Sequence, residues 1–405
     1  MIAEATILWH YMWGESPIKT LTISHMNNTK TYFKSTGESL FCDEYLYQEA
    51  MRHNPNSFLV LINQMVDWKK CAGKILKLYK AKGTLGAPAY KPEVLLKMMF
   101  LEFLFNVSDR EIERFVNDSI SMKNFLGFSL SDAAPDHSSL SVFRSRIVKK
   151  GRTDILHEMF EEIIRTAQEK GVKFGKVQVI DSTHTTANVN RFKDKQRQKP
   201  IKDGGEGKPP RDPDARTSVK RIETKITPQK TKVKVNKYIY GHKNHLSVNS
   251  EYGLITSIKV THAGRHDGHL FEELMKHDLE IGVAKRGETI FTADKGYEDG
   301  ENSEWLNQNQ LKDAIFYKGM AKKIKEATVK HPVYTSQEEF QEGAQKRYIV
   351  ERTNGALKKH GGLGLARYLG LEKMEIQSYL TAIVFNLKTL VKIIHGVTFR
   401  ANARF

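Results

Sequence analysis

Two short apolar runs, each closed by an aspartate, constrain the fold more than any other feature of this sequence. Residues 177–181 read Val-Gln-Val-Ile-Asp, and residues 289–294 read Thr-Ile-Phe-Thr-Ala-Asp. Apolar and β-branched runs of this length predict buried strands, each ending in its acid, Asp181 or Asp294. Strand and helix patterns alternate between and after them, so we expect a central α/β sheet. Acids at the carboxyl ends of neighbouring strands point into one crevice, where open α/β sheets hold their ligands.

A third acid, Glu351, lies on a predicted amphipathic helix over residues 345–360. Arg347 and Lys358 stand four residues before it and seven after it, so the three side chains share one helix face. An exposed charged face with ordinary ion pairs is the simpler interpretation. The alternative is a metal site, because two hard cations need carboxylates from separate elements to hold the attacking and leaving oxygens of a phosphoryl transfer.

The preceding segment, residues 51–172, is predicted to be helical because apolar residues recur at intervals of three and four through most of it. Pro92 suits the first turn of a helix, and Ser108 to Glu111 read as a capping box. Short helices follow, and the last of them is basic and carries Arg144. This pattern indicates a helix-turn-helix-like DNA-binding unit, with a plain helical bundle as the alternative.

The charge of the chain indicates a polyanionic partner. Its 64 Lys and Arg residues against 47 Asp and Glu residues give a formal net charge of +17. Residues 191–237 alone hold 16 basic and 6 acidic residues, with several prolines and glycines. Such a segment buries too little apolar surface to fold alone, so we expect a mobile arm, inserted after the first strand, that orders on a polyanion. An inert linker would not need so one-sided a charge.

Six short motifs follow one another along the rest of the chain. They are Val-Ile-Asp-Ser-Thr at 179–183, Asp-Pro-Asp-Ala-Arg at 212–216, Tyr-Gly-His-Lys-Asn-His at 240–245, Thr-His-Ala-Gly-Arg-His-Asp at 261–267, Ala-Asp-Lys-Gly-Tyr at 293–297, and Arg-x3-Glu-x6-Lys at 347–358. In this order the chain resembles the bacterial insertion-sequence transposases of the DDE type, closest to insertion-sequence family five and its near relatives. The resemblance implies a ribonuclease-H-like core: a mixed five-stranded sheet flanked by helices, preceded by a helical DNA-binding region.

The resemblance also implies roles for individual residues. The catalytic, metal-binding triad would be Asp181, Asp294 and Glu351. Two ions of Mg²⁺ or Mn²⁺ would bind per active site, with Arg347 and Lys358 on phosphates beside the scissile bond. Related transposases place a tyrosine three residues before the arginine, where this chain has Ala344. The chain therefore lacks the residue associated with positioning a flipped base.

Further basic side chains are expected to contact DNA: Lys243, His245, Lys295, Arg352, Arg144 and Arg216. The pair His242 and His245 could suggest zinc, but a three-residue spacing in a strand puts the two side chains on opposite faces. His245 is expected to have one of two roles: it lines the active-site crevice or contacts DNA, or it makes a structural hydrogen bond. Lys295 and Tyr297 follow the second aspartate closely enough to reach the DNA backbone.

These patterns predict four parts. Residues 1–50 form a poorly structured extension, 51–172 the helical DNA-binding region, 173–365 the catalytic domain with its insertion at 191–237, and 366–405 a C-terminal helix that packs on the core. The two cysteines, Cys42 and Cys71, exclude a disulfide framework and a cysteine-rich zinc site. No run reads as a membrane span, so we expect a bacterial cytoplasmic protein associated with the nucleoid.

The function predicted is that of a DDE transposase, a homodimer on double-stranded DNA that binds the terminal inverted repeats of its element and joins the cut ends to target DNA. Two alternatives remain: a catalytically inactive DNA-binding relative, such as a decayed or regulatory copy, and another ribonuclease-H-like nuclease. Retention of all three acids argues against the first. The second class usually uses four carboxylates and lacks a basic helical arm of this kind.

Overall fold

A computed structural model of the chain describes residues 33–34, 41–53, 57–79, 88–202, 204, 207–226 and 232–399. The extension predicted for residues 1–50 lies largely outside this part of the chain. Its residues 41–50 are helical rather than poorly structured, since they begin α2 (Phe41–His53). Tyr47 explains the order of this helix, because its side chain is buried and its hydroxyl donates to the Phe128 carbonyl oxygen at 2.6 Å.

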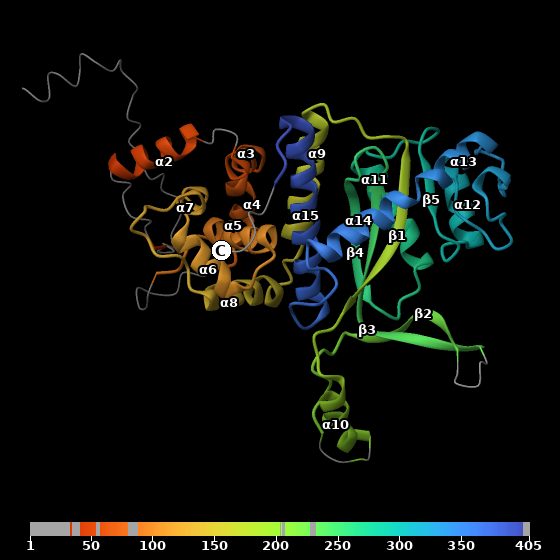
Figure 1. Cartoon of the computed structure of the whole chain (residues 1–405), viewed down its shortest axis with the longest axis horizontal. Coiled ribbons are helices and arrows are strands. Elements are labelled where there is room, and N and C mark those ends of the chain that lie inside the picture. Colours follow the sequence, from red (N-terminus) through yellow and green to blue (C-terminus); the bar gives the residue numbers. More distant parts are fainter. Residues whose placement is uncertain are drawn as a thin grey trace, which may run out of the picture.

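The helical region is a bundle centred on one apolar helix, α5 (Figure 1). Every residue from Val94 to Leu104 is buried, which accounts for a helix that is apolar on nearly all sides. The local signals are confirmed: Pro92 begins α5, and both reciprocal bonds of the Ser108–Glu111 capping box are present at the start of α6. After α2, the helices of this region are α3 (Phe58–Met65), α4 (Trp68–Leu76), α5 (Pro92–Phe105), α6 (Asp109–Asp118), α7 (Ile120–Leu126), α8 (His137–Lys149) and α9 (Asp154–Glu169).

The second part of the chain is built on a six-stranded mixed sheet. Its strands are β1 (Val177–Thr186), β2 (Arg216–Ile226), β3 (Lys232–Asn249), β4 (Ile255–His262), β5 (Ile290–Ala293) and β6 (Lys312–Asp313). β1 lies at the centre, antiparallel to β3 and parallel to β5, while β4 adds to β3 and β6 to β5. The order β4-β3-β1-β5-β6, three antiparallel strands followed by two parallel ones, is the ribonuclease-H-like arrangement. The sheet exceeds the predicted five strands by β2.

Helices cover both faces of this sheet. They are α11 (Phe271–Glu280), preceded by a short 3-10 turn η1 (Gly268–Leu270), α12 (Gly300–Gln308), α13 (Gln337–Lys346), α14 (Tyr348–Lys359) and α15 (Leu371–His395), with η2 (Ile324–Glu326) in a connecting segment. α11 bonds to Ser247 of β3 through Asp278, and α15 bonds to Asn244 through Ser378. Side chains three residues apart in a strand point to opposite faces, so these two helices lie on opposite sides. The helix predicted over 345–360 is instead parts of two helices, α13 and α14, because the helical conformation is interrupted at Arg347.

α15 stands between the sheet and the helical bundle, beside α9 (Figure 1). On the sheet side, the Asn386 amide bonds both to the Ile255 N–H at 2.9 Å and to its carbonyl oxygen at 2.7 Å. On the bundle side, Arg367, in the segment that leads into α15, donates to the buried carboxylate of Glu102 on α5 at 2.8 Å. The two parts of the chain are therefore joined by polar bonds as well as by apolar packing.

The described residues of the basic insertion form regular secondary structure, which its composition did not predict. It forms α10 (Arg191–Lys202) and the strand β2, which pairs with the first half of β3 from Arg216↔Gly241 to Ile226↔Lys232. Figure 1 shows α10 and this hairpin projecting from the body of the α/β part. The hairpin needs no apolar core of its own, because β3 continues out of the central sheet and offers its backbone hydrogen-bonding groups to β2.

Two of the sequence motifs hold the base of this arm. A Cβ atom on Gly241 would lie 2.1 Å from the Thr185 carbonyl oxygen, so only glycine permits the close approach of β1 and β3 there. The buried Asp212 carboxylate bonds to the His242 ring at 3.0 Å, and the Asp214 carboxylate accepts the Leu371 N–H at 2.8 Å. The Asp-Pro-Asp motif thereby ties the arm to the start of α15.

Candidate active site

The parallel pairing of β1 with β5 brings two of the predicted acids together. Ile180 is in register with Ala293, so the next residues, Asp181 and Asp294, leave the pair at adjacent positions. Asp181 does not end its strand, as the sequence suggested, because β1 continues to Thr186 along its antiparallel partner β3. Asp294 does follow the last residue of β5, and its carboxylate accepts the Gly296 N–H at 2.7 Å in a tight turn.

The Asp181 carboxylate has too little positive charge around it to offset its burial. Burial raises the pKa of Asp181 to about 6, and the carboxylates of Asp294 and Asp267 add to the shift. The backbone N–H of Ser182 and the guanidinium of Arg347 oppose it but do not cancel it. A half-buried oxygen ligand beside a second carboxylate is a suitable place for a hard divalent cation, which would stabilise the ionised form of both.

α14 crosses this position and is attached to it at two points. The Asn354 amide donates to the Asp181 carboxylate at 3.0 Å. At the start of the helix, the Arg347 guanidinium lies 5.3 Å from the centre of the Phe316 ring. The backbone N–H of Phe316 in turn donates to the carbonyl oxygen of Ala293, the last residue of β5, at 3.0 Å. Glu351 stands between these attachments, so the third acid belongs to the same corner of the sheet as the first two.

Glu351 is the most accessible of the three acids, with 54% of its side chain exposed, and its Oε1 lies 3.2 Å from Nη2 of Arg347. Among the described residues, only Glu113, Asp136 and His137 bring three potential ligand atoms within 4.8 Å of one another. The carboxylate oxygens of Asp181, Asp294 and Glu351 therefore do not all lie within 4.8 Å of one another, although the three residues belong to neighbouring elements. Three carboxylates of this kind still form the oxygen-rich donor set that Mg²⁺ or Mn²⁺ prefers.

The Glu113 group lies in the helical bundle and has a structural explanation. A single oxygen of Glu113 accepts both the backbone N–H of His137 and a bond from its Nδ1, each at 2.9 Å. Asp136 is the N-cap residue of α8 and accepts the Ser138 N–H at 2.7 Å. The two carboxylates thus accept N–H groups at the start of α8, and the His137 ring bonds to one of them.

Three of the predicted DNA contacts are buried, which corrects their interpretation. Arg144 is 3% exposed and donates to Glu102 at 3.2 Å and to Asp109 at 2.9 Å, so it is an internal ion-pair partner. Lys243 is also buried and lies 2.9 Å from Asp267. Interior cations of this kind already have their counter-ions and present no charge to a phosphate.

His245, the third of these, has the structural role of the two that were considered. Its ring is fully buried, bonds to the Thr261 hydroxyl at 2.9 Å, and has its pKa lowered to about 4 by burial. It is in register with Ser182, the residue after Asp181, so it points to the other face of the sheet from the first acid.

The remaining predicted contacts lie at the surface or partly so. Arg216, Lys295 and Arg352 are exposed, and Lys358 is half-buried near the end of α14. Arg216 donates to the carbonyl oxygens of Pro213 and Ala215, at 2.6 and 2.9 Å, which orients its side chain at the base of the arm. Tyr297, expected to reach the DNA backbone, is instead 1% exposed, and burial followed by nearby Asp267 raises its pKa well above the ordinary value.

Asn354 is the functional candidate that sequence reasoning missed. It stands three residues after Glu351 and four before Lys358, so it shares the face that carries Arg347, Glu351 and Lys358. The helical spacing could have identified it. The motif Arg-x3-Glu-x6-Lys drew attention to charged residues alone, whereas the residue that bonds to Asp181 is neutral.

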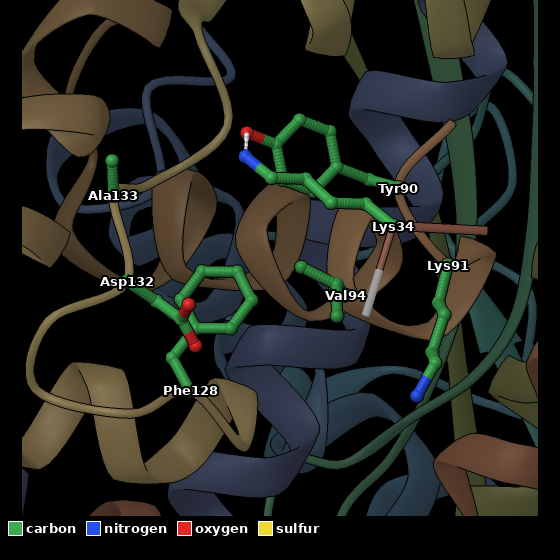
Figure 2. A pocket seen from close by; sticks show the side chains of 7 residues that line it. All are labelled: Lys34, Tyr90, Lys91, Val94, Phe128, Asp132 and Ala133. Carbon is green, nitrogen blue, oxygen red and sulfur yellow. Dashed lines mark hydrogen bonds between the residues drawn. The ribbon is translucent and has the colours of Figure 1, made fainter. Parts of the chain in front are cut away.

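Hollows elsewhere in the described chain differ from this site. One in the helical region, lined in part by Lys34, Tyr90 and Asp132, has a volume of only about 10 Å³ (Figure 2). The Lys34 ammonium donates across it to the Tyr90 hydroxyl at 3.1 Å. Such a volume holds about one water molecule and no substrate.

A ribonuclease-H-like sheet with one aspartate on β1 and a second directly after the adjacent β5 defines the class: a metal-dependent enzyme of phosphoryl transfer. Two family models agree with it. A transposase domain (DUF772) matches residues 47–146, and a transposase DDE domain matches residues 172–387, more than half of the chain. The chain belongs to the family of DDE transposases, which cleave DNA and transfer its strands with divalent metal ions.

Solved transposase structures resemble the chain only distantly. The piggyBac transposase synaptic complex with hairpin DNA matches with a TM-score of 0.37 and 10% identity, over 83% of this chain and 72% of that one. The Mos1 transposase paired-end complex matches with a TM-score of 0.20 and 9% identity, over 73% and 88%. Neither similarity is close enough to transfer residue roles. Within the described part of the chain, no helix combines the length and apolar character needed to cross a membrane.

Proposed function

We propose that this transposase binds the terminal inverted repeats of an insertion sequence and cuts and rejoins DNA through Asp181, Asp294 and Glu351. The observation that carries the proposal is the register of β1 and β5, which sets the two aspartates side by side beneath the helix that bears Glu351. The finer assignment to insertion-sequence family five stays a prediction, as do the four domain boundaries.

The three acids would hold two ions of Mg²⁺ or Mn²⁺. When bound, such ions lower the barrier to attack on a phosphodiester by water, and then by the freed 3′-hydroxyl on target DNA. The three carboxylates would fix the position of the ions and supply the negative charge that binds them. The raised pKa of Asp181 supports this role, because a desolvated carboxylate next to Asp294 is stabilised by a cation.

Arg347 and Lys358 are proposed to contact phosphates on either side of the scissile bond, from the helix face that also carries Glu351. Lys295, Arg352 and Arg216 are exposed and would extend this contact along the backbone. α10 and the hairpin of β2 and β3 belong to the segment 191–237, in which 16 basic residues outnumber 6 acidic ones. We further propose a homodimer on DNA, because two element ends must be cut together, and a place in the bacterial cytoplasm with the nucleoid.

The test is cleavage of a labelled duplex that carries the terminal repeats of the element, in Mg²⁺ or Mn²⁺. Asp181→Asn, Asp294→Asn and Glu351→Gln should each keep DNA binding and lose cleavage by about a thousandfold or more. Asp118→Asn and Glu301→Gln change exposed carboxylates elsewhere and should cleave like the wild type.

Each other outcome has a defined meaning. Binding of the repeats without cleavage in either metal would favour a decayed or regulatory copy. Cleavage of an RNA:DNA hybrid in preference to the repeats would favour another ribonuclease-H-like nuclease. A triad variant that still cuts the repeats would remove its residue from the metal site.

A further inference from the structure

A groove of about 480 Å³ lies where the helical bundle meets the α/β part. Its walls come from the end of α5, the end of α14, the turn after β3, the second half of α15 and the segment after it. The side chains that characterise it are aromatic or basic: Phe105, Tyr252, Phe385, Phe399, Lys388 and Lys392. We refer to it as the α5–α15 groove. Its volume lies in the range of small-ligand sites, about 300–1,000 Å³.

The groove is distinct from the candidate active site. Both use α14, but they use different sides of it. Glu351, Asn354 and Lys358 share the face toward Asp181, whereas Ala356 and His360 line the groove. With about 100° of rotation per residue, Ala356 and His360 point away from the Glu351 face.

The formal charge in the groove is entirely positive. Lys388 and Lys392 carry it, and no acidic side chain lines the groove. The Lys388 ammonium donates to the Leu104 carbonyl oxygen at 3.1 Å and lies 4.5 Å from the centre of the Phe399 ring. Neither Lys388 nor Lys392 forms an ion pair within the described residues.

A structural explanation covers only part of this arrangement. Leu104 lies in the last turn of α5, where carbonyl oxygens lack partners, and a lysine there is favourable. That bond uses one of the three N–H donors of Lys388. It does not explain the second lysine. The Phe399 ring packs against Phe58 and Phe105, with 4.8 and 5.6 Å between ring centres, so core packing accounts for part of the aromatic lining but not for the space that these rings border. Burial also lowers the pKa of Lys388 to about 8, the behaviour of a cation without a counter-ion.

Aromatic walls with cations and no acids complement a particular chemistry. Aromatic side chains stack on nucleobases of any sequence, and ammonium groups bind phosphate. Inorganic phosphate alone would make no use of the partly buried aromatic side chains, and an apolar ligand would leave the lysines without counter-ions. The combination fits a ligand that carries both an aromatic ring and a phosphate.

We propose that the α5–α15 groove binds a single nucleotide, with its base among Phe105, Phe385 and Phe399 and its phosphate on Lys388 and Lys392. The nucleotide could come from an unpaired position in DNA or from the free pool; the first source rests on the proposed function and the second does not. In either case this is a binding site apart from the three acids.

The experiment uses the full chain in metal-free buffer and measures binding of adenosine monophosphate, adenosine and inorganic phosphate by calorimetry. We expect the monophosphate to bind at least about tenfold more tightly than either part alone, since both halves of the groove are needed. Lys388→Met should weaken binding about tenfold or more, and Lys388→Arg should retain most of it. Lys373→Met, on the same helix outside the groove, is the matched control.

A second experiment distinguishes the two sources of the nucleotide. A short duplex with one unpaired nucleotide should bind more tightly than the fully paired duplex if the site takes a nucleotide of DNA, and equally if it takes a free one. Phe385→Leu keeps an apolar side chain and should weaken the monophosphate by loss of stacking. Thermal unfolding of every variant identifies any loss that is due to misfolding.

The proposal is overturned if no nucleotide binds, if Lys388→Met and Lys373→Met behave alike, or if phosphate alone binds as well as the monophosphate. A concentration-dependent dimer of the free chain, abolished by Lys388→Met without nucleotide binding, would assign the groove to a second copy instead. Asp181→Asn separates this result from the proposed function, because it should lose DNA cleavage and keep nucleotide binding.

Discussion

The Asn354 amide and the Asp181 carboxylate are joined by a hydrogen bond of 3.0 Å between residues 173 positions apart. The bond fixes one turn of α14 against the middle of β1. Glu351 lies on the same face of that helix, so its distance from the strand acids depends on this contact. Asn354 is therefore a positioning residue in the proposed metal site rather than a ligand.

Asn354→Ala should raise the concentration of Mg²⁺ needed for half-maximal cleavage. Losing a hydrogen bond to a charged group costs about 1.5–3 kcal/mol, so roughly a tenfold to hundredfold increase is expected. Saturating metal should recover much of the rate, which a merely unfolded variant would not do. The check is a metal titration of cleavage, with Asn307→Ala on α12 as the control. Identical titrations for Asn354→Ala and the wild type would contradict the positioning role.

Arg144→Met should destabilise the protein rather than weaken its hold on DNA. Removing this guanidinium leaves the buried Glu102 with one cation fewer, and breaking a buried pair costs about 3–5 kcal/mol. Thermal or denaturant unfolding measures the loss. Arg216→Met, at an exposed arginine, should leave the unfolding midpoint in place and weaken DNA binding. The reverse pattern would restore Arg144 as a DNA contact.

The exposed basic residues of α10 should contribute to the salt dependence of DNA binding. Lys193, Lys195 and Arg197 are exposed in this helix. Changing all three to Gln should reduce the slope of log K against log salt by about 0.9 for each phosphate that is no longer neutralised, or ~2.7 in total. Lys276, Lys285 and Arg286, near the opposite end of the sheet, form the control set. Equal slopes for the two triple variants would mean that α10 does not contact the backbone.

Lys388 should make stability rise with pH on the alkaline side. Burial lowers its pKa to about 8 in the folded chain, against about 10.4 when unfolded, so between these values the unfolded state binds more protons. The free energy of unfolding therefore increases from about pH 8 toward pH 10. Below pH 8 the folded chain carries a buried charge that Lys388→Met removes, so the variant should be the more stable at pH 7.

Denaturant unfolding of the wild type and of Lys388→Met from pH 7 to pH 10 tests this pH dependence. The other ionisable side chains that line the groove, His360, Lys392 and Tyr252, are present in both proteins. The difference between the two curves therefore reports on Lys388 alone. Parallel curves would show that the lysine is solvated in the folded state.

Local signals in the sequence were sufficient for the elements that depend on local chemistry. Pro92 and the Ser108–Glu111 box fixed two helix starts, because capping involves residues within one turn. The two apolar runs located β1 and β5, and the acids after them came with the strands. The face shared by Arg347 and Glu351 followed from helical spacing, and the ion pair between them has formed.

Long-range pairing accounts for what could not be predicted. β1 extends past Asp181 only because β3 continues beside it, and β2 is a strand only because β3 offers an edge. Arg144 looked like a DNA contact because its two carboxylate partners lie 42 and 35 residues away in the sequence. Asn354 was missed for the same reason, since its partner belongs to another element.

The bond between Glu102 and Arg367 spans 265 residues, from the helical bundle to the segment before α15. Insertion sequences recombine, and an exchange between two of them could pair one helical region with another catalytic domain. Here such a hybrid would inherit a buried carboxylate from one parent and depend on the other parent for its arginine. We expect the two ends of this gene to have been inherited together, and elements that replace Glu102 to have replaced Arg367 as well.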